Sequence, residues 1–439
     1  MSLAWVLAAF VLVTGPELSK KETRAARELL GDIVRAVDAD ERSRLADEAS
    51  RFDELAPAEL MAALRAGPLY PKGLPKERKL AGGRETLERF GSVVSGHAFE
   101  HDGQRYRYAV DVPEDYDPER AHAVLLDPGH GSGADQDAEG KAEFLEMYRR
   151  HADAAGGGDW LVVRTEIIEQ VGAGGPRELP EDQVVRIFDA FLRDLASIYH
   201  VDPARIYVAG LSQTGFWAWY LGRARADRWA GIAPMSAVTW QVDRWRENLL
   251  TLPTYVLHGE QDPTCPVAQP RATCAGLMAL GAPVRYDEIA RGAHDYGVWQ
   301  HLPRALTWLQ ANARESYPRR VSKSLGTDAA EQGGAWCHWL RADAWKARSS
   351  GKASWPPAAG IDGELDGQTV RLFSENVERV TLAFAPAMLD LAQPVVVVWN
   401  GETVFEGRLE TSARTTFAIA GERVDWSVLY AASLTLDAP

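Results

Sequence analysis

The chain has 439 residues, 46% of them hydrophobic and 25% charged, so it can bury a large core and is globular. Its formal net charge of −14 excludes an overall basic surface and argues against nucleic acid or an anionic membrane as a partner. Only three cysteines are present, at Cys265, Cys274 and Cys337, which excludes a disulfide framework. Whether Cys265 pairs with Cys274 stays open, because the sequence does not determine the distance between them.

The N-terminal segment, residues 1–16, contains a mainly apolar run that no Lys or Arg precedes. The run is too short to cross a bilayer and has the length of the apolar part of a secretory signal. We therefore expect no membrane span. The segment is either a signal for export to the periplasm or the medium, which we slightly favour, or a buried helix of a cytoplasmic protein.

Residues 17–89 are expected to form a helical region followed by a linker. Apolar residues such as Leu29, Leu30, Ile33 and Val34 recur at helical spacing and predict two or three amphipathic helices up to residue 66. The stretch 67–83 is rich in Pro and Gly, which is typical of a linker.

Residues 90–315 have the pattern of an α/β domain. An antiparallel pair of strands is expected first, and strands then alternate with helices. The expected strands are 92–97, 104–112, 123–126, 160–165, 206–209, 231–235, 254–258 and 284–289, with helices at 180–200 and 270–280. The alternation predicts a mostly parallel sheet with helices on both faces.

The last part of the chain changes character again. Residues 316–359 are expected to be an irregular linker, and residues 360–439 a small β domain. Within it, Asn400-Gly401 between two strand-like runs, 395–399 and 403–409, predicts a hairpin.

The segment Gly210-Leu211-Ser212 follows the apolar strand 206–209 and precedes residues compatible with a helix. This is the context of a nucleophile elbow, in which a sharp turn lifts a serine hydroxyl above the sheet. The usual pattern, Gly-x-Ser-x-Gly, is not complete, because Thr214 takes the place of the second glycine and Gly215 follows it. A β-branched residue there requires extra room beside the strand.

Two further motifs follow other expected strands, namely His258-Gly259-Glu260-Gln261-Asp262 and Gly292-Ala293-His294. Both lie where loops leave the carboxyl ends of strands, the edge at which open α/β sheets place their sites. The order Ser212, Asp262, His294 is the order of the α/β-hydrolase triad. Glu260 and Asp295 are the alternatives to Asp262 as the acidic member.

With these three motifs and the Asp202-Pro203-Ala204-Arg205 lead-in, residues 90–310 resemble the polyhydroxybutyrate-depolymerase and feruloyl-esterase-like esterases of the α/β-hydrolase superfamily. The resemblance implies that Ser212 attacks an acyl carbonyl, His294 carries the proton and Asp262 holds the imidazole. One oxyanion donor would be the N–H of Gln213. The other would come from the loop after strand 123–126, in either of two registers, Pro128-Gly129 or His130-Gly131.

Several other residues near these motifs have predicted roles. Trp299 is the first choice for lining an acyl or aryl pocket, with Phe216 as a second candidate. His258 is expected to be structural. We expect no cofactor, and no metal site formed by His130, His258 and His294, because no two of them have the close spacing of metal ligands on one element.

The sequence therefore predicts a serine esterase that acts on a small-molecule or polymeric ester through an acyl-enzyme. A peptidase of the prolyl-oligopeptidase kind is the alternative within enzymes, although the residues before the α/β domain are too few for a propeller. The alternative from another class is a catalytically degenerate hydrolase whose C-terminal β domain binds carbohydrate, polymer or protein.

Overall fold

The computed structural model describes residues 18–36, 38–73, 77–80, 83–129, 138–170, 181–239, 242, 245–295, 297–326, 335–346 and 359–439. The predictions for residues 1–16 lie outside these ranges. Among the helices described, none combines the length and apolar character needed to traverse a bilayer.

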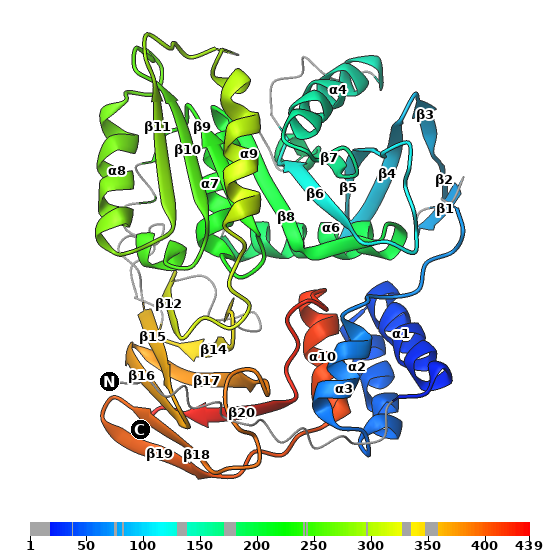
Figure 1. Cartoon of the computed structure of the whole chain (residues 1–439), viewed down its shortest axis with the longest axis vertical. Helices are drawn as coiled ribbons and strands as arrows, with labels where there is room; N and C mark the ends of the chain where they lie inside the picture. Colours follow the sequence, from blue (N-terminus) through cyan, green and yellow to red (C-terminus); the bar gives the residue numbers. More distant parts are fainter. Residues whose placement is uncertain are drawn as a thin grey trace, which may run out of the picture.

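A nine-stranded sheet with the order β11-β10-β9-β8-β6-β7-β5-β4-β3 forms the upper half of the molecule (Figure 1). Its strands are β3 (Glu88–Phe90), β4 (Val93–His101), β5 (Gln104–Asp111), β6 (His122–Asp127), β7 (Leu161–Thr165), β8 (Val201–Leu211), β9 (Gly231–Met235), β10 (Thr254–Gly259) and β11 (Val284–Ile289). Strands β6 to β11 pair in parallel, and β3 to β5 add an antiparallel edge next to β7.

Helices cover both faces of this sheet because its central strands alternate apolar side chains between two cores. Val124 and Leu126 point to one core, which includes side chains of α6 (Glu181–Ile198), α7 (Gln213–Ala224) and α8 (Ala268–Ala279). Leu125 points to the other, which includes α4 (Ala138–Ala154) and α9 (Leu302–Ala311). This confirms the predicted fold, a mostly parallel α/β-hydrolase sheet with helices on both faces.

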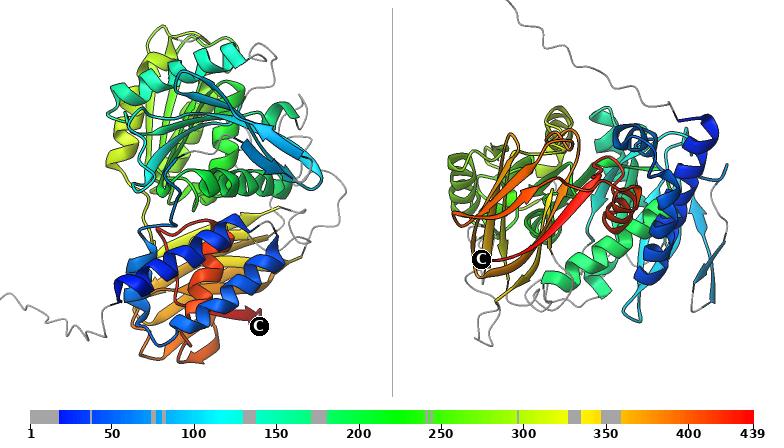
Figure 2. Two further views of the ribbon diagram at one scale, coloured as in Figure 1. Left: turned by 90° about the vertical axis from the view of Figure 1, so that its right-hand side faces the viewer. Right: turned by 90° about the horizontal axis from the view of Figure 1, so that it is seen from below.

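The lower half is built from both ends of the chain (Figures 1 and 2). It has a five-stranded sheet, β12-β15-β16-β18-β19, and a four-stranded sheet, β13-β14-β17-β20. The strands are β12 (Arg320–Leu325), β13 (Ala335–Cys337), β14 (Leu340–Trp345), β15 (Ala359–Asp366), β16 (Thr369–Glu375), β17 (Val377–Phe384), β18 (Val395–Trp399), β19 (Glu402–Gly407) and β20 (Ala432–Asp437). The N-terminal helices α1 (Lys20–Arg35), α2 (Ala39–Asp47) and α3 (Pro57–Leu64) share one hydrophobic core with both sheets.

Three details differ from the sequence-based expectations. The stretch 316–359, expected to be irregular, contains β12, β13 and β14. The expected linker 67–83 contains β1 (Glu77–Leu80), which pairs with β2 (Gly83–Thr86). A helix, α10 (Ala413–Arg423), interrupts the C-terminal strands. The question that the sequence left open is answered too: Cys265 and Cys274 are not paired, and all three cysteines are free and buried.

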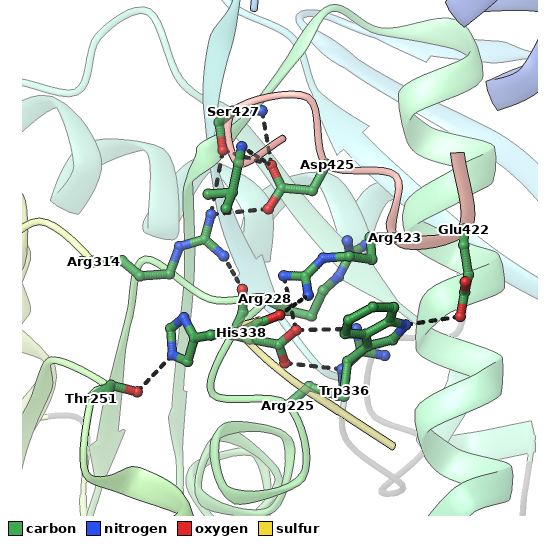
Figure 3. Close-up of polar contacts among 12 residues, drawn as sticks. Arg225, Arg228, Thr251, Arg314, Trp336, His338, Glu422, Arg423, Asp425 and Ser427 are labelled. Carbon is green, nitrogen blue, oxygen red and sulfur yellow. Dashed lines mark hydrogen bonds and ion pairs between the residues drawn. The ribbon is translucent and has the colours of Figure 1, made fainter. Parts of the chain in front are cut away.

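A buried polar network joins the two halves (Figure 3). Asp227, which follows α7, pairs with Arg225 at 3.1 Å and with Arg423 of α10 at 3.0 Å. Burial opposes ionisation of Asp227, but these guanidinium groups hold the pKa of its carboxyl far below the ordinary range. Arg314 similarly pairs with Asp425 at 3.1 Å. Since removing one partner of a buried ion pair is costly, this network fixes how the halves meet.

Candidate active site

The candidate nucleophile lies at a strained turn between β8 and α7. Ser212 has φ 57° and ψ −115°, a backbone conformation that residues other than glycine rarely adopt. Its N–H donates to the carbonyl oxygen of Met235 at 2.8 Å, and its own carbonyl accepts from Phe216 N–H in the first turn of α7. The strain is therefore held by β9 on one side and by the helix on the other.

The displaced second glycine has a local explanation. A Cβ at Gly210 would lie 2.4 Å from Thr214 Oγ1, so the space that Thr214 needs is provided by the absent side chain of Gly210. The Thr214 hydroxyl donates to Leu211 O at 3.0 Å. A Cβ at Gly215 would lie 2.7 Å from the carbonyl oxygens of both Gly210 and Met235. The close approach of α7 to the sheet thus requires glycine at 210 and 215, and Thr214 is compatible with the turn.

The structure brings Ser212, His294 and Asp262 into one hydrogen-bonded chain. Ser212 Oγ–H donates to His294 Nε2 at 2.9 Å, and His294 Nδ1–H donates to Asp262 Oδ2 at 2.8 Å. A carboxylate only accepts hydrogen bonds, so Nδ1 carries the proton and Nε2 is left basic toward the serine. This is the geometry that general-base activation of a serine requires.

Asp262 is held by its own turn. Its Oδ1 accepts from the backbone N–H groups of Thr264 at 2.9 Å and Cys265 at 2.7 Å, which leaves Oδ2 for His294. Burial works to raise the pKa of Asp262, but hydrogen bonds from Cys265, His294 and Thr264 outweigh it, and the pKa lies below its ordinary value. The carboxyl group is therefore ionised at neutral pH.

The two alternatives to Asp262 have other partners. Glu260 accepts the backbone N–H of Arg291 at 2.9 Å, and Asp295 accepts that of Gly297 at 2.8 Å. Asp262 is the carboxylate that the structure places against His294.

His258 stabilises the same turn through a hydrogen bond to its backbone. Its Nε2–H donates to Cys265 O at 2.7 Å, and the same nitrogen lies 3.6 Å from Asp262 Oδ2. Burial lowers the pKa of His258, although the Cys265 carbonyl and the Asp262 carboxylate act against it. His258 therefore has the structural role expected from the sequence. The roles of Thr264 and Cys265 were not predicted, although Asp262-Pro263 is a turn signal that indicates such backbone hydrogen bonds.

The described part of the chain also brings the ligand atoms of Asp262, Cys265 and His294 within 4.8 Å of one another. Burial, and then the Asp262 carboxylate, raise the pKa of the Cys265 thiol to about 11, so it is protonated and a poor ligand. Asp262 and His294 are already bonded to each other. The donor chemistry favours a proton-transfer chain over a metal site.

The two expected oxyanion donors differ in how far the structure describes them. Gln213 is the first residue of α7, where backbone N–H groups and the helix dipole favour negative charge. His130 and Gly131 lie outside the described residues. The base of their loop is anchored, because Thr165 Oγ1 donates to Pro128 O at 2.6 Å and a Cβ at Gly129 would lie 2.1 Å from Thr165 O.

The two aromatic candidates lie in different surroundings. Trp299 is 3% exposed and its ring meets Tyr148 of α4 edge-on, with centroids 4.5 Å apart. Trp299 is therefore a core residue that packs between α4 and the loop after His294. Phe216, in the first turn of α7, is half-buried and one turn of helix from Ser212.

No protein-family model and no curated protein sequence matches this chain. Among solved structures, a thermostable esterase is similar over 54% of this chain and 71% of its own, with 19% identity and a TM-score of 0.42. A ferulic acid esterase is similar over 50% and 97%, with 18% identity and a TM-score of 0.41. An S-formylglutathione hydrolase from Staphylococcus aureus is similar over 48% and 96%, with 16% identity and a TM-score of 0.38.

Proposed function

We propose that this protein is a serine hydrolase that cleaves carboxylic esters through an acyl-enzyme. The observation that carries the proposal is the hydrogen-bonded chain from Ser212 through His294 to Asp262, with Ser212 at a strained elbow. Strained backbone at the end of a strand that also presents a hydroxyl to a base is a common mark of a nucleophile.

The geometry supports a two-step reaction. Ser212 Oγ forms a bond to the acyl carbon while its proton passes to His294 Nε2, and Asp262 stabilises the resulting imidazolium. The N–H of Gln213 at the start of α7 is suited to stabilise the oxyanion. The alcohol then leaves with the proton from His294, and water repeats the sequence to release the acid and restore Ser212.

The substrate class within esters rests on the sequence motifs. Their resemblance to polyhydroxybutyrate depolymerases and feruloyl esterases supports small aryl or aliphatic esters and polymeric esters as the first substrates to test. Phe216 is the described aromatic side chain that we propose for the acyl or aryl contact.

The test is labelling with a fluorophosphonate probe together with hydrolysis of p-nitrophenyl acetate. We expect the wild-type protein to be labelled, and Ser212→Ala to lose labelling and to retain only about 10³–10⁴-fold acceleration over water. The matched control is Ser197→Ala, whose hydroxyl donates to Asp194 O within α6.

Three results would contradict the proposal. Folded wild-type protein that takes no label would indicate a degenerate hydrolase, and unchanged ester turnover in Ser212→Ala would exclude Ser212 as the nucleophile. Hydrolysis of a p-nitroanilide faster than the matching ester would instead indicate a peptidase.

A further inference from the structure

A second polar cleft lies away from the triad, where the two halves of the chain meet. It has a volume of about 450 Å³, which is within the range of small-molecule sites. Its floor is formed by β12, β15 and β16, which lie directly below the α/β half in Figure 1, and η4 (Arg246–Leu249) contributes Glu247 from that half. The side chains that matter for binding are Ser322, Asp362, Phe373 and Glu375.

The strand register places the key side chains on one face of the sheet. Ser322 of β12 pairs with Asp362 of β15, which in turn pairs with Phe373 of β16. Directly paired residues point to the same side of a sheet, so these three form a row across the cleft. Glu375 lies two residues along from Phe373 on the same face.

Phe373 is 56% exposed, one of only two large hydrophobic side chains that are exposed in the described part of the chain. An isolated exposed apolar residue needs no explanation, but this one lines a cleft whose other functional groups are polar. Its ring is therefore available as a flat surface for a ligand.

The acceptors of the cleft are not used by the protein itself. Within the described ranges, the carboxylates of Asp362 and Glu375 have no hydrogen-bond or ion-pair partner. The Ser322 hydroxyl also has none there, although Ser322 is only 8% exposed. The Ser322 hydroxyl oxygen is not fully enclosed by the protein, so a ligand in the cleft can reach it and complete its hydrogen bonding.

Three other polar side chains that line the cleft already have partners within the described part of the chain. Asn400 accepts from Ser374 N–H at 2.9 Å and donates to Ser374 O at 3.2 Å. The Lys323 ammonium group is buried and donates to Ala224 O at 2.5 Å. Glu247 has Arg246 within 3.7 Å. Asp362 and Glu375 therefore leave two negative charges uncompensated by these neighbours.

The cleft is also rigid on the side where the halves meet. Asn248 of η4 bonds β12 in both directions, accepting from Ser324 N–H at 2.6 Å and donating to Ser324 O at 3.2 Å. A preformed site loses less entropy when a ligand binds.

We propose that this cleft binds an organic cation with ammonium or guanidinium groups. Such a ligand supplies what the cleft lacks: N–H donors for Asp362, Glu375 and Ser322, positive charge for the two free carboxylates, and a cation to lie over the Phe373 ring. The ligand is either a free polyamine or a Lys- or Arg-containing segment of a partner protein. The proposal does not depend on the esterase activity.

The test is calorimetric titration of the full chain at low salt with spermidine, agmatine, a blocked peptide carrying two lysines, and cellobiose as a neutral ligand. We expect saturable binding of the cations, weakened by 0.5 M NaCl, and no binding of cellobiose. If the peptide binds more tightly than spermidine, the ligand is a segment of a partner protein. If spermidine binds more tightly, the ligand is a free polyamine. Ser212→Ala should bind the cations as the wild-type protein does.

Substitutions in the cleft test whether the cation binds there. We expect Asp362→Asn with Glu375→Gln to weaken binding at least about fivefold, and Phe373→Ala to weaken it about two- to fivefold. The matched control is Glu364→Gln, an exposed carboxylate two residues from Asp362 that does not line the cleft. Absence of saturable cation binding, binding of cellobiose in place of the cations, or equal weakening by Glu364→Gln would overturn the proposal.

Discussion

Each carboxylate oxygen of Asp262 has a separate role in the candidate site. One carboxylate oxygen accepts two backbone N–H groups, and the other accepts the imidazole N–H of His294. Because both oxygens are committed, the carboxyl group cannot rotate without breaking hydrogen bonds. The residue therefore sets both the tautomer and the orientation of His294.

Replacing this carboxylate tests its role. Asp262→Asn keeps an acceptor for Thr264 and Cys265 but presents an amide to His294, which favours the wrong tautomer and removes the charge that stabilises the imidazolium. We expect kcat for p-nitrophenyl acetate to fall by about 10⁴-fold with KM nearly unchanged.

The control for this prediction is Asp295→Asn, one residue beyond His294, where the carboxylate caps Gly297 N–H instead. It should leave kcat within about threefold of wild type, since its loss removes no contact to His294. A large loss of kcat in Asp295→Asn with little loss in Asp262→Asn would show that Asp295, and not Asp262, is the acidic member of the triad.

At the scale of elements, the packing of α7 against β8 and β9 determines where Ser212 lies. Gly215 is the contact point, because a Cβ there would meet two backbone carbonyl oxygens that cannot move independently of the sheet. Gly222, two turns further along α7, would instead meet side-chain methyl groups of Ile232 and Leu252. The same substitution should therefore have different effects at the two ends of one helix.

We expect Gly215→Ala to lower the free energy of unfolding by about 1–3 kcal/mol and to reduce kcat, because α7 must shift away from the sheet and carry Ser212 and Gln213 with it. Gly222→Ala should cost less, since flexible side chains can yield and alanine favours the helix. Urea unfolding and ester kinetics of both variants measure this. Equal activity losses in the two variants would show that the approach at Gly215 is not what positions Ser212.

A comparison of predicted and observed elements shows where sequence patterns were sufficient to predict a strand or a helix. Strands 231–235 and 284–289 were predicted with their observed bounds. The first is fully buried, as central strands of a parallel sheet are, whereas the second is the partly exposed edge strand β11. Helix α10 was missed because its sequence, ARTTFAIAGER, contains Thr, Phe and Ile, which favour strands. Packing against the N-terminal helices, with Phe417 stacked on Phe52 at 5.8 Å, stabilises it as a helix.

At the scale of the whole molecule, His338 lies at the contact between the two halves and is bonded across it. It occupies the turn between β13 and β14 with φ 55°, and its Nε2 is hydrogen-bonded to the hydroxyl of Thr251 at 2.7 Å. Burial, opposed by Asp227, lowers the pKa of His338 to about 3. The folded chain therefore keeps a neutral imidazole at this junction. Figure 3 shows His338 with its bond to Thr251.

This burial predicts a pH dependence of stability. Between the ordinary pKa of 6.5 and the folded pKa of about 3, the unfolded chain binds a proton that the folded chain does not, so the free energy of unfolding falls as the pH falls through this window. His338→Asn removes the titrating group and suits a positive φ.

We expect urea unfolding at pH 7 and pH 4.5 to show a smaller pH dependence in His338→Asn than in the wild type, by up to about 1.4 kcal/mol per pH unit. His301→Asn is the control, because the pKa of this more exposed histidine is also lowered by burial but it lies on the α/β half. An identical pH dependence in wild type and His338→Asn would show that the junction does not exclude the proton.

The sequence alone determined the α/β sheet, because strand and helix periodicities are local properties of each segment. It also placed Ser212, Asp262 and His294 at strand ends on one edge, since parallel strands present their carboxyl ends together. Only the tertiary structure decided that both chain ends form one core, that Gly210 makes room for Thr214, and that Phe373, Asp362 and Ser322 share a cleft. These depend on contacts between residues far apart in the chain, which a single sequence does not encode as a local pattern.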